Sequence, residues 1–109
     1  MTPESYAEFI YKSASLYAEA KSNRIGKELA VKITKSILMK HAQKNGVTQL
    51  SAQERDAIAD EDFLICIKEY QESVKIEEEL KYKIDAAKLC IDIWRTREAS
   101  ERLAIRSHE

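Results

Sequence analysis

The sequence predicts an all-α protein: an elongated antiparallel two-helix hairpin, coiled-coil-like, with a short helical turn between its helices. Apolar residues return at helical spacing over two long stretches, near residues 3–45 and 61–105. Only two glycines and one proline occur in 109 residues, whereas a sandwich or barrel needs turn residues about every 8–12 positions. With 44% hydrophobic and 34% charged residues, the composition is that of one folded domain, residues 1–109.

The first helix is predicted to begin after Thr2 and to continue to about Asn45. Thr2 supplies a hydroxyl N-cap, Pro3 suits the first helical position, and Glu4 lies near the positive end of the helix dipole. Gly46 is expected to end the helix as its C′ residue. The apolar positions expected to form its helical pattern are Tyr6, Phe9, Ile10, Leu16, Tyr17, Ala20, Leu29, Ile33, Ile37 and Leu38.

A short helix is predicted after a connector at residues 47–50. Ser51 and Glu54 have the spacing of a capping box, in which each side chain satisfies the other residue's free backbone N–H, so this helix is expected to begin near Ala52. Asp60 offers a second N-cap, where the long helix would begin. The two starts can also fuse into one helix from residue 52, and both arrangements give a hairpin.

The long helix carries a narrow apolar seam with one imperfect step at Glu77. The mean period of the seam is nearer 3.5 than 3.6 residues, which favours a left-handed wrap against another helix. The seam residues, predicted to serve packing and oligomerisation, are Phe63, Ile67, Tyr70, Val74, Leu80, Ile84, Ala87, Ile91 and Trp94. Trp94 is interpreted as a packing anchor.

Oligomerisation is predicted because two helices share only one contact strip. Off-seam apolar residues such as Ile65, Ile76 and Ile93 would lack cover inside a monomer, so a homo-oligomer is expected. Cys66 and Cys90 lie 24 residues apart on the same helix, roughly 36 Å, and are expected to be reduced thiols within or beside the seam.

The net charge of −1 conceals a segregation along the chain. Residues 1–48 carry eight Lys/Arg and four Asp/Glu, residues 49–79 carry three and ten, and residues 80–109 carry seven and five. On the first helix a basic stripe falls within an arc of roughly 80°. The stripe consists of Lys21, Arg24, Lys32 and Lys35.

This basic stripe has two interpretations. It can follow a nucleic-acid phosphate backbone, or it can be a solvated face that meets the acidic stretches 54–62 or 69–79 of another segment. The C-terminal arginines Arg95, Arg97 and Arg102 likewise suit either phosphate binding or compensation of the helix dipole.

Two segments that frame the long helix resemble a family of small helical bacteriophage proteins. AQERDAIADEDF (52–63) is followed by a helix ending in KIDAAKLCIDIWRTREASER (83–102), similar to their "AAQER…A…Y" turn and "A…I.IWRT.EAS.R" tail. The preceding YAEAKSNRIGKELAVKITKSILMKHAQ (17–43) fits their first helix. Such proteins tend to be encoded among phage replication and recombination genes. In layout they are also similar to recombination mediators of the UvsY type, which oligomerise and bind single-stranded DNA.

Two functional interpretations follow. The first is a non-enzymatic phage accessory protein for DNA recombination or replication, whose oligomer binds single-stranded DNA or a DNA-bound partner through the basic stripe. The second is a protein–protein adaptor or inhibitor that acts through the acidic middle segment without nucleic acid. The near-zero charge favours the second interpretation, because nucleic-acid binders are usually basic, and the resemblance favours the first.

Catalytic residues, cofactors, metal ligands and a small-molecule substrate are not expected. His41 and His108 are isolated, and adjacent carboxylates such as Asp60, Glu61 and Asp62 point around a helix rather than to one centre. No apolar run reaches the roughly 18 residues of a membrane span, and the N-terminus lacks the order of a secretion signal. A cytoplasmic location, within the host cell for a phage protein, is therefore expected.

Overall fold

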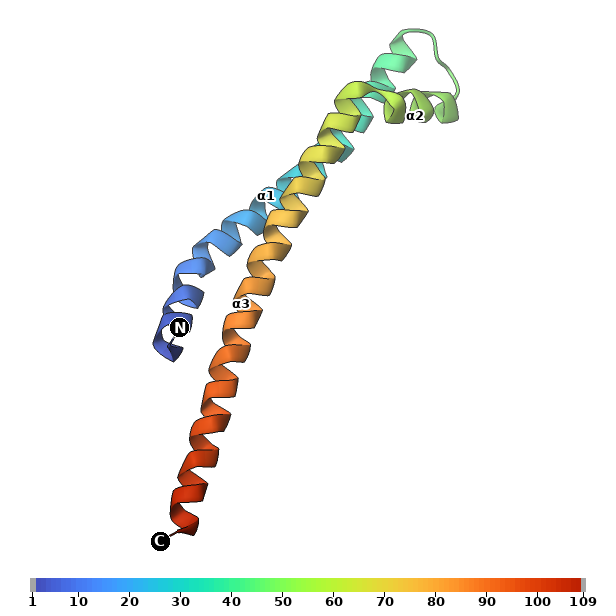
Figure 1. The fold of residues 1–109 in the computed structure, drawn as a ribbon. Helices are drawn as coiled ribbons and strands as arrows, with labels where there is room; N and C mark the ends of the chain where they lie inside the picture. Colours follow the sequence, from blue (N-terminus) through green and yellow to red (C-terminus); the bar gives the residue numbers. More distant parts are fainter. Residues whose placement is uncertain (1, 109) are drawn as a thin grey trace. The chain divides into compact units, whose positions relative to one another are not determined.

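The computed structural model describes residues 2–108, which form three helices and no strand. The helices are α1 (Pro3–Lys44), α2 (Leu50–Ala59) and α3 (Glu61–Ser107), as Figure 1 shows. The all-α class predicted from the sequence is therefore confirmed. None of these helices carries an apolar stretch of the length that a bilayer crossing requires.

The ends of α1 follow from local hydrogen bonding. Thr2 Oγ1 accepts a hydrogen bond from the backbone N–H of Ser5 at 3.2 Å, as an N-cap does. At the other end Gly46 adopts a positive φ of 95°, and the N–H of Val47 donates to the carbonyl of Ala42 at 3.0 Å. This is a Schellman closure, which uses a glycine at C′ because a side chain there is strained.

The start of α2 differs from the predicted capping box. The helix begins at Leu50, its N-cap is Gln49, and no side-chain hydrogen bond caps it. Ser51 therefore lies inside the first turn, and the capping-box prediction is wrong. The reason lies in Gln53, whose side chain is buried. Its Nε2 donates a hydrogen bond to the carbonyl of Val47 at 2.7 Å, and this bond ties the connector to the first turns of α2.

Asp60 separates α2 from α3. Its backbone is extended (φ −69°, ψ 140°), so the two predicted helix starts do not fuse. Asp60 Oδ1 accepts the N–H of Asp62 at 2.8 Å and thereby caps α3. The break lets α2 and α3 take different directions at a single residue.

The helices contribute to two compact units, and each pairs one segment of α1 with one segment of α3. Unit 2 comprises Glu19–Glu77, and unit 1 comprises Met1–Ala18 with Glu78–Glu109. Pairing in unit 2 is antiparallel. Arg24 of α1 bonds Glu77 of α3, and Thr34, which comes after Arg24 in α1, contacts Cys66, which comes before Glu77 in α3. In unit 1 the start of α1 lies beside residues 90–97, and residues 10–17 lie beside residues 81–88, which is also antiparallel.

A row of buried and half-buried residues on α3 repeats in alternating steps of three and four, a heptad pattern that suits helix pairing with a period near 3.5. We call these residues the α3 seam: Phe63, Cys66, Tyr70, Ser73, Glu77, Leu80, Ile84, Ala87 and Ile91. Ile67 and Val74, predicted as seam residues, are half-buried beside it. Trp94 departs from the packing-anchor interpretation, since 43% of its surface is exposed.

The covered residues of α1 follow the same heptad pattern. We call them the α1 seam: Pro3, Tyr6, Ile10, Ser13, Tyr17, Ala20, Arg24, Lys27, Val31, Thr34 and Leu38. The predicted pattern on this helix was partly wrong, because four of its residues are 51–55% exposed: Leu16, Leu29, Ile33 and Ile37. The face of α1 that carries Arg24 turns inward instead, since the buried Glu77 of α3 needs a cation.

The apolar core is thin. Within residues 2–108 the buried hydrophobic residues are Ala57, Phe63 and Ala87, and no large side chain is completely buried. Ser13, Gln53, Ser73 and Glu77 are buried as well, so polar groups occupy part of both seams. Stability of the single chain therefore rests on a narrow strip of contacts.

We predict that Asp60→Ala destabilises the protein by about 1 kcal/mol, because it removes the bond that caps α3. Ser51→Ala is the matched control: its hydroxyl caps nothing, and its effect should stay within about 0.5 kcal/mol. Urea unfolding followed by circular dichroism measures both. A larger loss for Ser51→Ala than for Asp60→Ala would contradict this assignment of the caps.

Candidate interaction surfaces

A bidentate ion pair in unit 2 joins Arg24 of the α1 seam to Glu77 of the α3 seam. The Nε and Nη2 atoms of Arg24 donate to Oε2 and Oε1 of Glu77 at 2.6 and 3.4 Å. Arg24 Nη1 also donates to Glu28 Oε2 at 3.2 Å. The hydrogen bond to Glu77 raises the pKa of Arg24 above its ordinary value. This fork-shaped pair occupies the imperfect step of the predicted seam.

Two further ion pairs follow the same interface. Lys27 Nζ lies 3.1 Å from Glu69 Oε2, and Lys35 Nζ lies 2.6 Å from Glu54 Oε1. Cations of α1 therefore meet carboxylates in the acidic stretches 54–62 and 69–79 of the same chain. Antiparallel pairing within unit 2 thus gives a structural reason for the charge segregation seen in the sequence.

The predicted basic stripe is divided by this pairing. Arg24 and Lys35 take part in the ion pairs just described, whereas Lys21 and Lys32 are exposed. Lys27 was not part of the predicted stripe, although its seven-residue spacing from Thr34 and Ala20 marks it as a seam position. The stripe is not one continuous solvent-facing row of charge.

The C-terminal arginines remain at the surface of unit 1. Arg95 and Arg102 have side chains that are 71% and 72% exposed, and their ion pairs with Asp92 and Glu98 are long, at 3.9 and 3.8 Å. Such exposed pairs within one helix contribute little to stability. These guanidinium groups are therefore accessible to an anionic partner.

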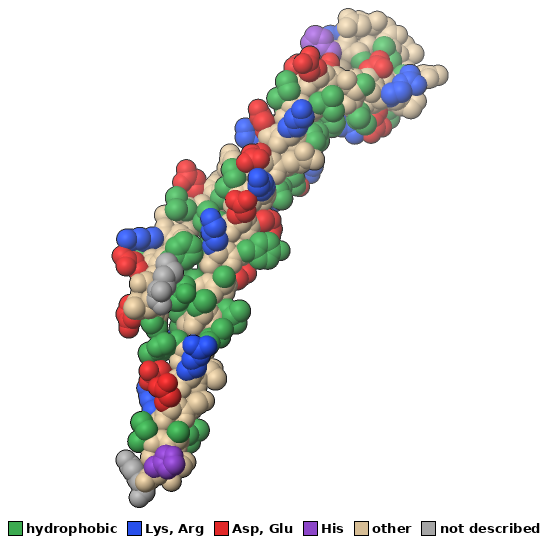
Figure 2. All heavy atoms as spheres, viewed as in Figure 1, with side chains coloured by type: hydrophobic (Ala, Val, Ile, Leu, Met, Phe, Trp, Pro, Cys, Tyr) green, Lys and Arg blue, Asp and Glu red, His purple; other side chains and the backbone are tan. Residues whose placement is uncertain are grey.

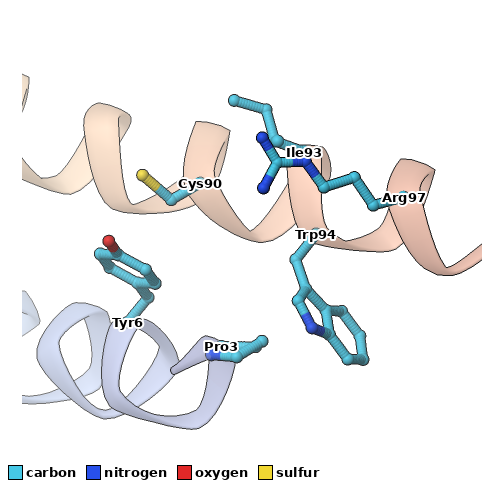
Figure 3. Close-up of a pocket in the computed structure, with 6 residues that line it drawn as sticks. All are labelled: Pro3, Tyr6, Cys90, Ile93, Trp94 and Arg97. Atoms are coloured by element: carbon cyan, nitrogen blue, oxygen red, sulfur yellow. The ribbon is translucent and has the colours of Figure 1, made fainter. Parts of the chain in front are cut away.

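A shallow pocket of unit 1 lies between the start of α1 and residues 90–97 of α3 (Figure 3). The hydroxyl end of Tyr6 points toward the sulfur of Cys90, and Pro3 lies between Tyr6 and the indole of Trp94. Hydrogen bonding to Cys90 raises the pKa of Tyr6 above its ordinary value of 10.0. The pocket is thus a contact between the two helices with a partly open rim.

This pocket is small. Its volume of about 220 Å³ falls below the roughly 300–1,000 Å³ typical of ligand sites. Cys66 and Cys90 are both free thiols, and the Cys66 sulfur lies 3.3 Å from the hydroxyl of Thr34. Among residues 2–108 no group of three or more His, Cys, Asp or Glu side chains is placed to hold a metal ion.

Large apolar side chains are exposed on both long helices. Figure 2 shows hydrophobic side chains at the surface between charged ones. The off-seam residues Ile65, Ile76 and Ile93 are 48%, 43% and 44% exposed, so the described part of this single chain leaves them without full cover. The remaining large exposed apolar residues are Tyr11, Leu16, Ile25, Leu29, Ile33, Ile37, Leu50, Ile58, Leu64, Tyr82, Leu89, Trp94, Leu103 and Ile105. Contiguous apolar surface, rather than scattered apolar residues, marks interaction sites.

Comparison of this chain with protein-family models, curated proteins and solved structures finds no match.

We predict that Glu77→Ala lowers the melting temperature by several degrees, because it leaves Arg24 in the seam without its main acceptor. Glu69→Ala is the control: its pair with Lys27 is exposed, so its effect should stay below about 0.5 kcal/mol. Differential scanning calorimetry measures both variants. Equal losses would mean that the Arg24–Glu77 pair has no special role.

A pH prediction follows from the raised pKa of Tyr6. Neutral Tyr6 should stabilise the folded state below about pH 10, and this contribution should be lost as the pH rises through the raised pKa. Tyrosinate absorbance should show one tyrosine that titrates late, and Tyr6→Phe should remove it. Cys90→Ala should move this titration back toward the ordinary value, whereas Cys66→Ala should not. An unchanged titration curve in Cys90→Ala would contradict the Tyr6–Cys90 contact.

Proposed function

We propose that the chain is a non-enzymatic accessory protein of bacteriophage DNA recombination or replication. In this proposal it is oligomeric, and it docks through its helix faces on a protein partner that is bound to DNA. The sequence resemblance supports the phage context. The antiparallel two-helix hairpin predicted from the sequence belongs to the same proposal, and the antiparallel pairing within each unit supports it.

The observation that carries this proposal is the contrast between charges and apolar residues at the surface. The basic stripe suggested direct nucleic-acid binding, but two of its four residues form ion pairs inside unit 2. Arg24 binds Glu77, and Lys35 binds Glu54. Isoleucine and leucine side chains on α1 and α3 remain half exposed. Burial of apolar surface contributes about 25 cal/mol per Å², so helix faces of this kind favour protein partners.

Direct binding of single-stranded DNA is a second candidate function. The specific observation in its favour is the exposure of Arg95 and Arg102, together with the exposed Lys21 and Lys32. Arg97, which lines the pocket of unit 1, lies two residues from Arg95. Their positive charges would contact phosphates without reading sequence.

Retention on immobilised single-stranded DNA distinguishes the two candidates. We expect the protein to be retained at near-physiological salt on DNA that is coated with a recombinase or a single-strand-binding protein, and to pass over naked DNA. Retention on neither surface would overturn the proposed function. Equal retention on naked and coated DNA would favour the second candidate.

If naked DNA does retain the protein at low salt, the salt dependence identifies the residues responsible. The double variant Arg95→Ala with Arg102→Ala should then lower the log–log slope by about 1.4, the loss expected for two single-strand phosphate contacts. Lys27→Ala with Lys35→Ala is the matched control, because these lysines already bind Glu69 and Glu54 and should leave the slope unchanged. Unchanged helicity by circular dichroism is required of each variant.

A further inference from the structure

α1 presents a second apolar face in unit 2, directly opposite the α1 seam. At 100° per residue this face spans an arc of roughly 140°, and the seam residues Arg24 and Val31 lie on the other side of the helix. We call it the outer face of α1: Ser22, Ile25, Gly26, Leu29, Ala30, Ile33 and Ile37. Its four large side chains are 50–55% exposed, and Lys21 and Lys32 flank it.

Residue size is unequally distributed along the midline of this face. Ser22 and Gly26 occupy its N-terminal half, where Ile25 lies at the edge of the face, whereas Leu29, Ile33 and Ile37 follow in its C-terminal half. A Cβ built at Gly26 meets no atom within 4 Å, so this part of the face is open. An antiparallel copy would set the small half of one helix against the large half of the other. A parallel copy would set large against large and small against small.

Charge is distributed with the same polarity. Glu19 lies at the N-terminal end of the midline and Lys40 at its C-terminal end. These two residues are almost equidistant from the middle of the face, near Leu29 and Ala30. An antiparallel pair would bring Glu19 of each copy toward Lys40 of the other, whereas a parallel pair would bring like charges together.

We propose that the outer face of α1 is an interface for a second copy of this chain, packed antiparallel about a two-fold axis near Leu29 and Ala30. A two-fold interface requires one surface to be complementary to itself, and both the size and the charge patterns meet that requirement. Gly26 then allows close approach of the two helices, and Ile33 of the partner fills the open space. This interface specifies the oligomer within the proposed function, yet it does not depend on the identity of the DNA-bound partner.

Single-cysteine crosslinking tests the orientation, in a Cys66→Ser/Cys90→Ser background. Ala30→Cys lies near the axis and should form a disulfide-linked dimer. Ile37→Cys alone should not, because its two copies would lie about 20 Å apart, beyond the roughly 7 Å reach of a disulfide. A mixture of Ile37→Cys and Ser22→Cys chains should form the mixed dimer. Leu50→Cys on α2 is the control for random collision.

Sedimentation equilibrium tests the interface without crosslinking. The wild type should sediment as a dimer or larger species of the 12.5 kDa chain. Ile33→Glu should weaken association at least tenfold, because it places a carboxylate in the apolar interface. Leu50→Glu, on an exposed residue outside the face, should leave association unchanged. Circular dichroism should show equal helicity for all three proteins.

Three results would overturn the inference: a wild-type monomer at micromolar concentration, self-crosslinking of Ile37→Cys, or association of Ile33→Glu that equals that of the wild type. The DNA-retention experiment tests docking on the DNA-bound partner separately from this interface. A dimer that is not retained on coated DNA would overturn the proposed function and leave this interface intact. A retained monomer would overturn this interface and the oligomeric part of the proposed function, and it would leave docking on the DNA-bound protein intact.

Discussion

The Arg24–Glu77 pair is the interaction that constrains the arrangement of unit 2. A carboxylate whose side chain is only 9% exposed needs a cation close by, and Arg24 is the seam residue of α1 that supplies one. Sliding α1 by one heptad would place Arg24 opposite Tyr70 or Ile84 and leave Glu77 buried without its bidentate partner. The polar layer therefore fixes the register of two otherwise repetitive helices, at some expense of stability compared with an apolar layer.

That constraint also determines which side of α1 faces solvent. Apolar residues occur on both sides of α1, so hydrophobicity alone does not select the inner face. Because Arg24 must reach Glu77, Leu29, Ile33 and Ile37 turn outward. The need to pair Arg24 with Glu77 thereby places the outer face of α1 toward solvent. The exposed apolar surface of α1 and the charge pairing inside unit 2 therefore have the same cause.

Elements governed by local chemistry could be predicted from the sequence. The helix ends at Thr2, Gly46 and Asp60 agree with their capping residues, and the heptad spacing predicted the apolar positions of the α3 seam. It did not predict that Ser73 and Glu77 are buried or that Trp94 is exposed. The inward face of α1 could not be predicted, because it depends on a partner 53 residues away. The capping box at Ser51 failed for a similar reason, since a bond from Gln53 to the connector starts the helix earlier.

The thin core bears on how this protein would behave at different abundances. In the proposed oligomer, a folded state with so little buried apolar area would gain much of its free energy from association, and such a gain depends on concentration. Chains made in small number would spend more time partly open, where proteases act on them. The proposed association through exposed helix faces would therefore couple the lifetime of the protein to its copy number: isolated chains would be removed and assembled ones would persist.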